Sequence, residues 1–405
     1  MRHIKPLLSG IAFALLIATG CRKDFDTESR APGVLAEEKT AAKLSAKTKE
    51  NMARLRAAFP QGVAGKLQKN THLFPRLNTE YRQMALRALQ TRALKVGALK
   101  AIEPTPCNGD TRLIQWLSSE LTDWSAEDIQ FAMDFGLLDI PSLYALIFEN
   151  SSHCQYFGEE GQYTAILTKT FRNLRRFWRI ESDDIVLVAM DGRTLLDQEK
   201  VSLTLQVAYG LTAADANQIA EVIVNAVATN PAYRKGDHPF FSFNAFAQPA
   251  FELDPVGTIP DKIVMGDGIL EGFEEIGYGD VAPQAVLAHE FGHHVQFALG
   301  VYDDLELTPE NSRYTELMAD AMAAYYLSHD RGAAIQWNRC RSFLKIFFNL
   351  GDCAFTNPNH HGTPAQRMAA AEWGYDLAND AKKQEYILSP RKFITLFNAN
   401  FNRIV

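Results

Sequence analysis

The sequence predicts an α+β fold that is mainly helical and contains a small sheet. Amphipathic stretches with helical spacing dominate the chain, whereas two short runs, 183–192 and 261–268, have the β-branched, turn-bounded pattern of strands. With 405 residues, of which 47% are hydrophobic and 22% charged, the chain can bury a sizeable core. We expect two or three folded units, or one domain with large insertions.

The amino terminus has the pattern of a secretory leader. Arg2 and Lys5 precede a short apolar run, Leu7–Gly20, which is too short to be read as a membrane span. The ending "IATGC" resembles a bacterial lipobox, in which Cys21 would carry the lipid; the alternative is an ordinary cleaved signal peptide. We therefore expect a protein lipid-anchored to a bacterial inner or outer membrane, on the periplasmic or cell-surface side.

Composition divides the chain into four segments. Residues 1–20 are the predicted lipoprotein signal peptide, and 21–75, rich in Ala, Lys, Glu and Thr, are a predicted solvated tether. Residues 76–160 read as a helical region of unknown role, with no chemical motif and with aromatic residues, among them Trp116, Trp124 and Phe131, that fit a core. A second folded body covers 161–405, with a probable insertion at 194–240.

Charge and cysteine content limit the partners and the compartment. A formal net charge of -7, without a dense basic stripe, predicts no binding of nucleic acid. Apart from Cys21, the chain has four cysteines, an even number that suits an oxidising compartment. The shortest-loop pairing joins Cys107 to Cys154 and Cys340 to Cys353, and free buried thiols are the alternative.

The stretch "AVLAHEFGHHVQFALG", residues 285–300, is predicted to form a helix. Asp280 can cap its start, Pro283 suits the first turn, and Gly300 stands where a glycine commonly follows a helix. Gly292, in the middle of this helix, costs about 1 kcal/mol relative to alanine. Its presence there indicates that another element passes close by.

This helix carries a His-Glu-x-x-His string. His289 and His293 are one turn apart on the same face and can bind one zinc ion, while Glu290 can lean toward an open coordination position and take a proton from water. The metzincin spacing would require glycine at 296 and histidine at 299. The sequence has Gln296 and Leu299, which excludes that class.

A second predicted helix, in "TPENSRYTELMADAMAAYYLSH" (308–329), offers a third ligand. Glu316 and Asp320 lie one turn apart on one face, among apolar residues that indicate burial. Glu316 can complete the ligand set, and Asp320 can accept a hydrogen bond from the ring of a ligating histidine. A solvated acidic face is disfavoured, because buried carboxylates are costly without a cation.

The stretch 359–378 begins another helix and offers two further candidates. His361 or Arg367 would lie near the site as an oxyanion donor or an anchor for a substrate carboxylate; the alternative is a loop histidine and an ion-pair arginine. His294 and His360 each neighbour a better candidate, and we expect neither to take part.

Three ordered motifs together resemble a known family. "GDVAPQAVLAHEFGHHVQFALG", "SRYTELMADAMAAYYLSH" and "HGTPAQRMAAAEWGY" are similar to the bacterial neutral zinc metallopeptidase family, of the gluzincin type, over residues 163–405. The resemblance implies a zincin-like domain with the two motif histidines and Glu316 as ligands of one Zn²⁺ and Glu290 as general base. It also implies an edge strand that aligns substrate, to which we assign 261–268.

The predicted function is that of a zinc-dependent metalloendopeptidase. Glu290 would assist the attack of a zinc-bound water on a peptide bond of a peptide or protein substrate, and His361 or a nearby tyrosine would hold the oxyanion. The alternative is a non-catalytic surface lipoprotein that uses a structural zinc site to bind a partner or a glycan. An open fourth coordination position distinguishes the first function from the second.

Overall fold

The computed structural model describes residues 74–96, 111–306, 308–335, 337–351, 361–380 and 386–405. Contacts divide the chain into two units, Met1–Lys39 and Thr40–Val405, and all described residues belong to the second unit. The predicted signal peptide with Cys21, and nearly all of the predicted tether, lie outside the described residues.

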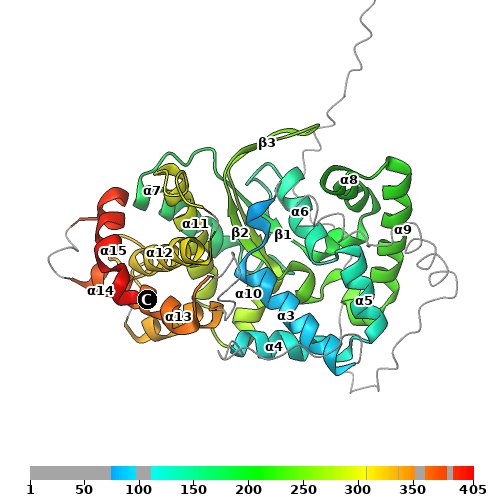
Figure 1. The fold of residues 1–405 in the computed structure, drawn as a ribbon, viewed down its shortest axis with the longest axis horizontal. Helices are drawn as coiled ribbons and strands as arrows, with labels where there is room; N and C mark the ends of the chain where they lie inside the picture. The colour runs from blue at the N-terminus through cyan, green and yellow to red at the C-terminus, as the bar shows by residue number, and fades with distance from the viewer. Residues whose placement is uncertain (1–73, 97–110, 307, 336, 352–360, 381–385) are drawn as a thin grey trace, which may run out of the picture. The chain divides into compact units, whose positions relative to one another are not determined.

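Helices make up most of the described chain, which confirms the mainly helical α+β class (Figure 1). Many of them begin at a serine or threonine whose side chain accepts a hydrogen bond from a backbone N–H of the first turn. The α-helices are α3 (Glu80–Lys95), α4 (Arg112–Glu120), α5 (Ala126–Phe135), α6 (Asp139–Phe148), α7 (Thr164–Trp178), α8 (Gln198–Tyr209), α9 (Ala213–Thr229), α10 (Asp267–Glu275), α11 (Ala282–Ala298), α12 (Pro309–Ser328), α13 (Trp337–Leu350), α14 (Pro364–Asn379) and α15 (Pro390–Ile404). Short 3-10 helices also occur: η2 (Pro75–Leu77), η3 (Leu121–Asp123), η4 (Gly192–Leu196), η5 (Pro231–Gly236) and η6 (Pro239–Ser242).

The strands form one small mixed sheet and one hairpin. Three strands, β1 (Val186–Met190), β5 (Lys262–Gly266) and β2 (Ala245–Gln248), lie in the order β1-β5-β2, with β1 parallel and β2 antiparallel to β5. The hairpin pairs β3 (Phe251–Leu253) with β4 (Gly257–Ile259). Both predicted strand runs are therefore strands of the three-stranded sheet.

The prediction that 261–268 forms the edge strand is wrong. This run contains β5, which pairs on both sides and whose five residues are all buried. Both faces of β5 are covered too, and a strand that is buried on both faces has a nearly continuous apolar sequence. The edge strand on this side of the sheet is β2.

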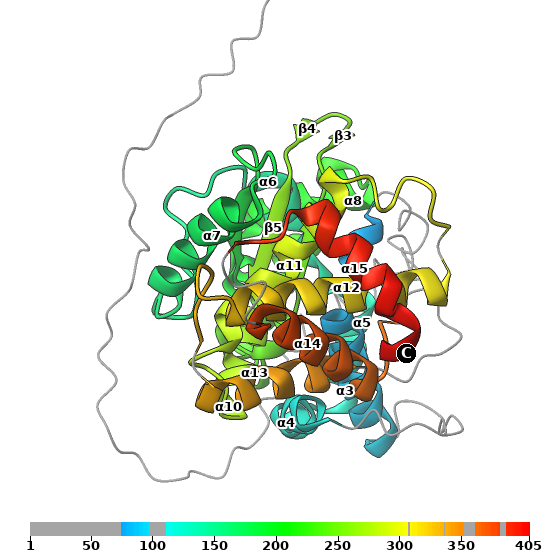
Figure 2. The same ribbon diagram turned by 90° about the vertical axis from the view of Figure 1, so that its left-hand side faces the viewer.

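Helix α12 packs against α11 and against α14 through small residues, and it lies between them (Figure 2). A Cβ atom at Gly292 would lie 3.2 Å from Cα of Ala319, and one at Gly374 would lie 2.1 Å from the carbonyl oxygen of Ala321. The backbones of α11 and α14 therefore approach α12 from two sides. The element that passes close to Gly292, as the sequence indicates, is α12.

The start of α11 differs from the prediction. The residue before its first turn is Val281, which offers no capping side chain, and Asp280 instead accepts hydrogen bonds from Arg339 of α13. Tertiary pairing has replaced the local cap. The end is as expected, because Gly300 follows α11 with a φ of 68°.

The amino-terminal helices α3 to α6 are joined to the body through a shared core. Trp124 and Phe131 are buried, as predicted, whereas Trp116 is partly buried against the core. The stretch Ala126–Phe148 is apolar and long enough to cross a membrane, but 78% of the relevant window is buried inside the fold. Its helices α5 and α6 are thus core helices of this structure.

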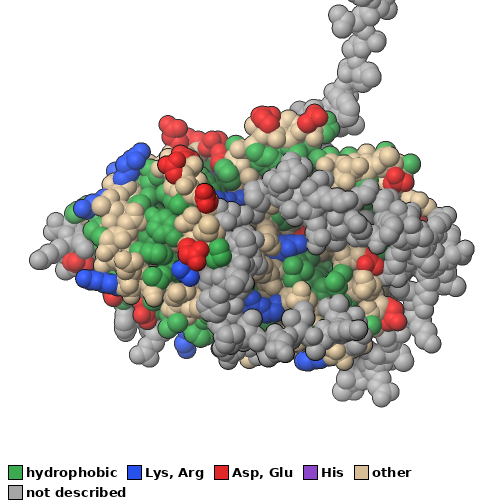
Figure 3. Space-filling model, viewed as in Figure 1, with side chains coloured by type: hydrophobic (Ala, Val, Ile, Leu, Met, Phe, Trp, Pro, Cys, Tyr) green, Lys and Arg blue, Asp and Glu red, His purple; other side chains and the backbone are tan. Residues whose placement is uncertain are grey.

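On the face shown in Figure 3, lysine and arginine side chains are scattered among apolar and acidic ones. Cys154 is disulfide-bonded. The residues Cys107 and Cys353 and the side chain of Cys340 lie outside the described part of the chain, and with them both predicted pairings.

Candidate metal centre

The structure brings the three predicted ligands together. Nε2 of His289 lies 3.2 Å from Nε2 of His293, and the carboxylate of Glu316 lies 3.2 Å from the first nitrogen and 3.4 Å from the second. All three side chains are buried. They reach one point because α11 and α12 are in close contact at Gly292.

The ring of His289 is oriented by Asp320, as the sequence predicts. Nδ1 of His289 lies 2.9 Å from Oδ1 of Asp320, and the guanidinium of Arg367 donates to both Asp320 oxygens at 2.6 Å. Nδ1 of His289 is a donor to Asp320, because a carboxylate oxygen that accepts from a guanidinium accepts from the ring as well. Against the effect of burial, Asp320 and Glu316 raise the pKa of His289, so that without a metal its Nε2, which is directed toward the centre, can hold a proton that faces Glu316.

The ring of His293 is oriented by Gln296. Nδ1 of His293 lies 3.0 Å from Oε1 of Gln296, whose amide nitrogen donates to the carbonyl of Thr315 at 2.7 Å. The Tyr302 hydroxyl lies 3.0 Å from the same Nδ1 and donates to Oε1 of Gln296. With Oε1 able only to accept, Nδ1 is the donor and Nε2 carries the lone pair.

These donor atoms fit a divalent cation. Ligand atoms at zinc distances and tetrahedral angles are about 3.3–3.5 Å apart, close to the separations seen here. A cation there would take the place of the proton that His289, with its raised pKa, otherwise holds at Nε2 facing Glu316. In addition, the buried Oε2 of Glu316 has no hydrogen bond of good geometry among the described residues.

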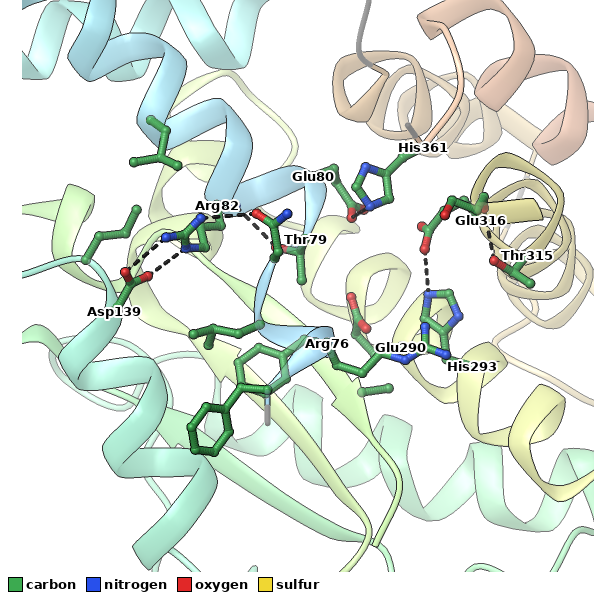
Figure 4. A pocket seen from close by; sticks show the side chains of 18 of the residues that line it. Arg76, Thr79, Glu80, Arg82, Asp139, Glu290, His293, Thr315, Glu316 and His361 are labelled. Atoms are coloured by element: carbon green, nitrogen blue, oxygen red, sulfur yellow. Dashed lines mark hydrogen bonds and ion pairs between the residues drawn. The ribbon is translucent and has the colours of Figure 1, made fainter. Parts of the chain in front are cut away.

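Glu290 lies at the open side of this ligand set. Ligand atoms of His289, Glu290 and His293 are all within 4.8 Å of one another, and Glu290 lines a cavity of about 860 Å³ (Figure 4). Burial raises the pKa of Glu290 to about 8, opposed by His289 and reinforced by the carboxylates of Glu80 and Glu316. A carboxylate with a pKa near neutrality suits a group that accepts and returns a proton.

Both candidates from the third motif lie at the centre. Arg367 is buried and joins Asp320 to Glu80, with Nη1 3.1 Å from Oε1 of Glu80. His361 lines the cavity, with Nε2 4.0 Å from Oε2 of Glu80. Arg367 thus acts in an ion-pair network, and His361 faces the region where a substrate would bind.

His294 lies away from the centre, as expected. Its Nε2 is 2.9 Å from the carbonyl oxygen of Lys262, and its Nδ1 is 3.5 Å from Asp261. These contacts tie α11 to the central strand β5. His360 lies outside the described residues.

Two residues at the centre come from the amino-terminal helical region, which the sequence marks as free of chemistry. Glu80, at the start of α3, has an oxygen 3.9 Å from Nε2 of His289. The next residue, Tyr81, has a buried hydroxyl with no hydrogen-bond partner among the described residues, and burial, Glu80 and Glu290 raise its pKa. No local pattern distinguishes these side chains from an ordinary helix start.

Among the described residues β2 pairs only with β5, and its other edge adjoins the cavity although the strand itself is buried. The backbone N–H of Gly266 donates to the carbonyl of Asn244, so Phe246, two residues on, also pairs with β5. The backbone groups of Ala247 therefore point away from β5, and both Phe246 and Ala247 line the cavity. An extended peptide could pair with this edge.

The chain matches no protein-family model, and no curated protein or solved structure is similar enough to it to identify a family.

Proposed function

We propose that the chain is a zinc-dependent peptidase. The observation that supports this proposal best is the set of three inward-facing donors, two imidazole nitrogens and one carboxylate, with a further buried carboxylate, Glu290, beside their open side. Three protein ligands and one open position are the arrangement of catalytic rather than structural zinc. Nitrogen and oxygen donors in this number favour Zn²⁺ over Mg²⁺ or Ca²⁺.

Zinc, when bound, would polarise the scissile carbonyl and make water a stronger acid. The chain's own residues then divide the remaining work. Glu290 takes the proton from the attacking water and returns it to the leaving amine. A cation held by the three ligands would oppose the burial that raises the pKa of Glu290, and so favour the carboxylate form that acts as a base.

Other residues hold the substrate and the developing negative charge. His361 is the candidate donor to the oxyanion, since it lines the cavity beside Glu80. The free edge of β2, at Ala247, would align an extended peptide by backbone hydrogen bonds. In this role β2 takes the place of 261–268, the segment that the sequence suggested as the edge strand.

The decisive experiment replaces Glu290 by Gln and measures peptide hydrolysis together with zinc content. We expect hydrolysis to fall by about 10²–10⁴-fold, because the general base is lost, while zinc stays bound. Glu310→Gln, at an exposed carboxylate in the first turn of α12, is the matched control and should keep full activity. Full activity of Glu290→Gln would sink the mechanism.

A specific observation favours a second candidate function, a non-catalytic protein with a closed zinc site. Glu80 belongs to a group, with His289 and Glu316, whose ligand atoms lie within 4.8 Å of one another. If Glu80 supplied a fourth ligand, no position would remain for water. X-ray absorption of the zinc-loaded protein separates the two functions, because the catalytic site has three protein ligands and one water oxygen.

The expected setting of either function is the outer side of a bacterial membrane, held there by a lipid on Cys21. Replacement of Cys21 by Ala should release the protein from the membrane fraction. A variant that stays with the membrane would contradict the anchor.

A further inference from the structure

Glu80 lies beside the candidate metal ligands but has no role in the proposed hydrolysis. Its carboxylate is buried next to the ligand set, and only Oε1 is engaged by Arg367, at 3.1 Å. Nε2 of His361 lies 4.0 Å from Oε2, which is beyond hydrogen-bond distance. Figure 4 shows the Glu80 carboxylate directed toward His361 and the space in front of Glu316.

The distances place Glu80 beyond the ligand set. Its Oε1 is 3.9 Å from Nε2 of His289, whereas the three ligand atoms are 3.2–3.4 Å from one another. Oε1 is also held by Arg367, whose guanidinium competes with a metal for the same oxygen. Glu80 is therefore suited to a cation beside the metal rather than to the metal itself.

The segment before Glu80 lies across the cavity, with the candidate metal ligands on one side of it and Asp139 on the other. The side chain of Asn244, next to β2, bonds to the carbonyl of Leu77 and to the hydroxyl of Thr79, which ties the segment to the edge strand. At the other side, the guanidinium of Arg76 lies 4.0 Å from the centroid of the Tyr302 ring. A peptide that paired with β2 and continued past Glu80 would meet this segment.

A peptide whose first residue lies at Glu80 avoids that obstruction. In any peptide, the nitrogen of a residue is about 2.5 Å from its carbonyl carbon, so the first ammonium group lies close to the first scissile bond. The carboxylate of Glu80, whose Oε1 is 3.9 Å from Nε2 of His289, is close enough to the candidate metal ligands to bind that ammonium. Burial makes such a charge-assisted hydrogen bond selective, because a blocked amine would leave Oε2 of Glu80 without this donor, while Arg367 engages only Oε1.

We propose that Glu80 binds the free α-ammonium group of the substrate, and that the enzyme removes the first residue of a peptide. This inference rests on the proposed zinc-dependent hydrolysis. In the reaction, water adds its hydroxyl to the first carbonyl carbon, the first peptide bond breaks, and the water proton passes through Glu290 to the leaving amine. The products are a free amino acid and a peptide shortened by one residue.

The test compares peptides that differ only in whether their amino terminus is free or Nα-acetylated, with a random first residue. For the zinc-loaded wild-type protein we expect mass spectrometry to show loss of the first residue from the free peptides. Acetylated peptides should react at least about 100-fold more slowly in kcat/KM, since the charged pair with Glu80 is lost. Equal rates, or cleavage at internal bonds, would overturn the proposal but leave the zinc-dependent hydrolysis intact.

Glu80→Gln should reduce this preference for free peptides to less than about 10-fold, with the larger change in KM. The preference is a ratio, so it is independent of a general loss of activity. Asp128→Asn is the matched control, because Asp128 is a buried carboxylate of α5 that accepts a hydrogen bond from the side chain of Asn230 and does not line the cavity. This control should keep the wild-type preference.

Binding to the Glu290→Gln protein gives a measurement that does not need turnover. Calorimetry should show tighter binding of free peptides than of acetylated ones, also by at least about 100-fold. If Glu80→Gln instead raises hydrolysis and X-ray absorption shows a protein oxygen replaced by water, Glu80 is a metal ligand and the proposal is wrong. Absence of any hydrolysis by the zinc-loaded wild type would contradict the proposed function itself.

Discussion

The helix pair α11–α12 and the helix α3 contribute to the same centre by different means. On α11 and α12, His289 and Asp320 are 31 positions apart and their side chains bond directly, within one stretch of recognisable motifs. Glu80 on α3 and Arg367 on α14 are 287 positions apart, and neither the spacing nor the residues around Glu80 indicate their contact. Ligands placed by helical periodicity can be read locally, whereas a carboxylate placed by packing cannot.

We expect the largest effect from replacing Glu316, the predicted metal ligand on α12, while α3 is unchanged. Glu316→Gln replaces an anionic ligand by an amide, so the bound zinc should fall from about one per chain to near zero, with loss of hydrolysis. Elemental analysis after dialysis measures this, and Glu310→Gln serves as the control. A variant with a full complement of zinc would show that α11 and α3 can hold the metal without α12.

Arg367 joins the two regions, so its replacement tests both together. Arg367→Met leaves the buried carboxylates of Asp320 and Glu80 without their cation, which should lower the free energy of unfolding by about 3–5 kcal/mol. Urea unfolding of the metal-free protein measures the change. Arg391→Met, at an exposed arginine of α15, should leave the unfolding free energy within about 0.5 kcal/mol of wild type.

Replacement of Asp320 tests the orientation of a predicted metal ligand without removing any ligand. Asp320→Asn weakens the acceptor that orients His289, and metal affinity should fall by about 10–100-fold. Competition with a chelator measures the affinity. Glu80→Gln should cause a smaller loss of metal affinity, because in our proposal Glu80 neither binds the metal nor orients a ligand. An equal loss of affinity would show that α3 contributes to metal binding as α11 and α12 do.

The last prediction concerns a contact away from the centre, between His238, at the start of η6, and the end of α4. Burial, with a smaller contribution from Arg234, lowers the pKa of His238 to about 3, while its Nε2 lies 3.1 Å from the carbonyl oxygen of Glu120 at the end of α4. In the unfolded chain the pKa of histidine is about 6.5. Between these values only the unfolded chain takes up the proton, so stability should fall as the pH falls below about 6.5.

Urea unfolding of the metal-free protein between about pH 7.5 and 4.5 measures this slope. His238→Gln should flatten it, because glutamine has no proton to gain. Identical slopes in the two proteins would show that other groups control the acid sensitivity of this region.

Sequence patterns determined the helices that carry the candidate centre and which of its side chains are neighbours on one helix. A period of 3.6 residues puts His289 beside His293, and Glu316 on the same face as Asp320, whatever the rest of the fold. The apolar residues around Glu316 and Asp320 indicate a buried helix, and the glycine at 292 indicates a close neighbour. These inferences are local, and so the structure agrees with them.

Only the tertiary structure decided which parts of the chain meet there. It placed β5 at the centre of the sheet and β2 at its edge, because strand order depends on pairing between distant segments. It also brought Arg367, His361 and Glu80 to the ligands, since helix packing joins residues that no period relates. The candidate metal ligands could thus be named from the sequence, whereas the position of Glu80 beside them depends on packing between distant helices.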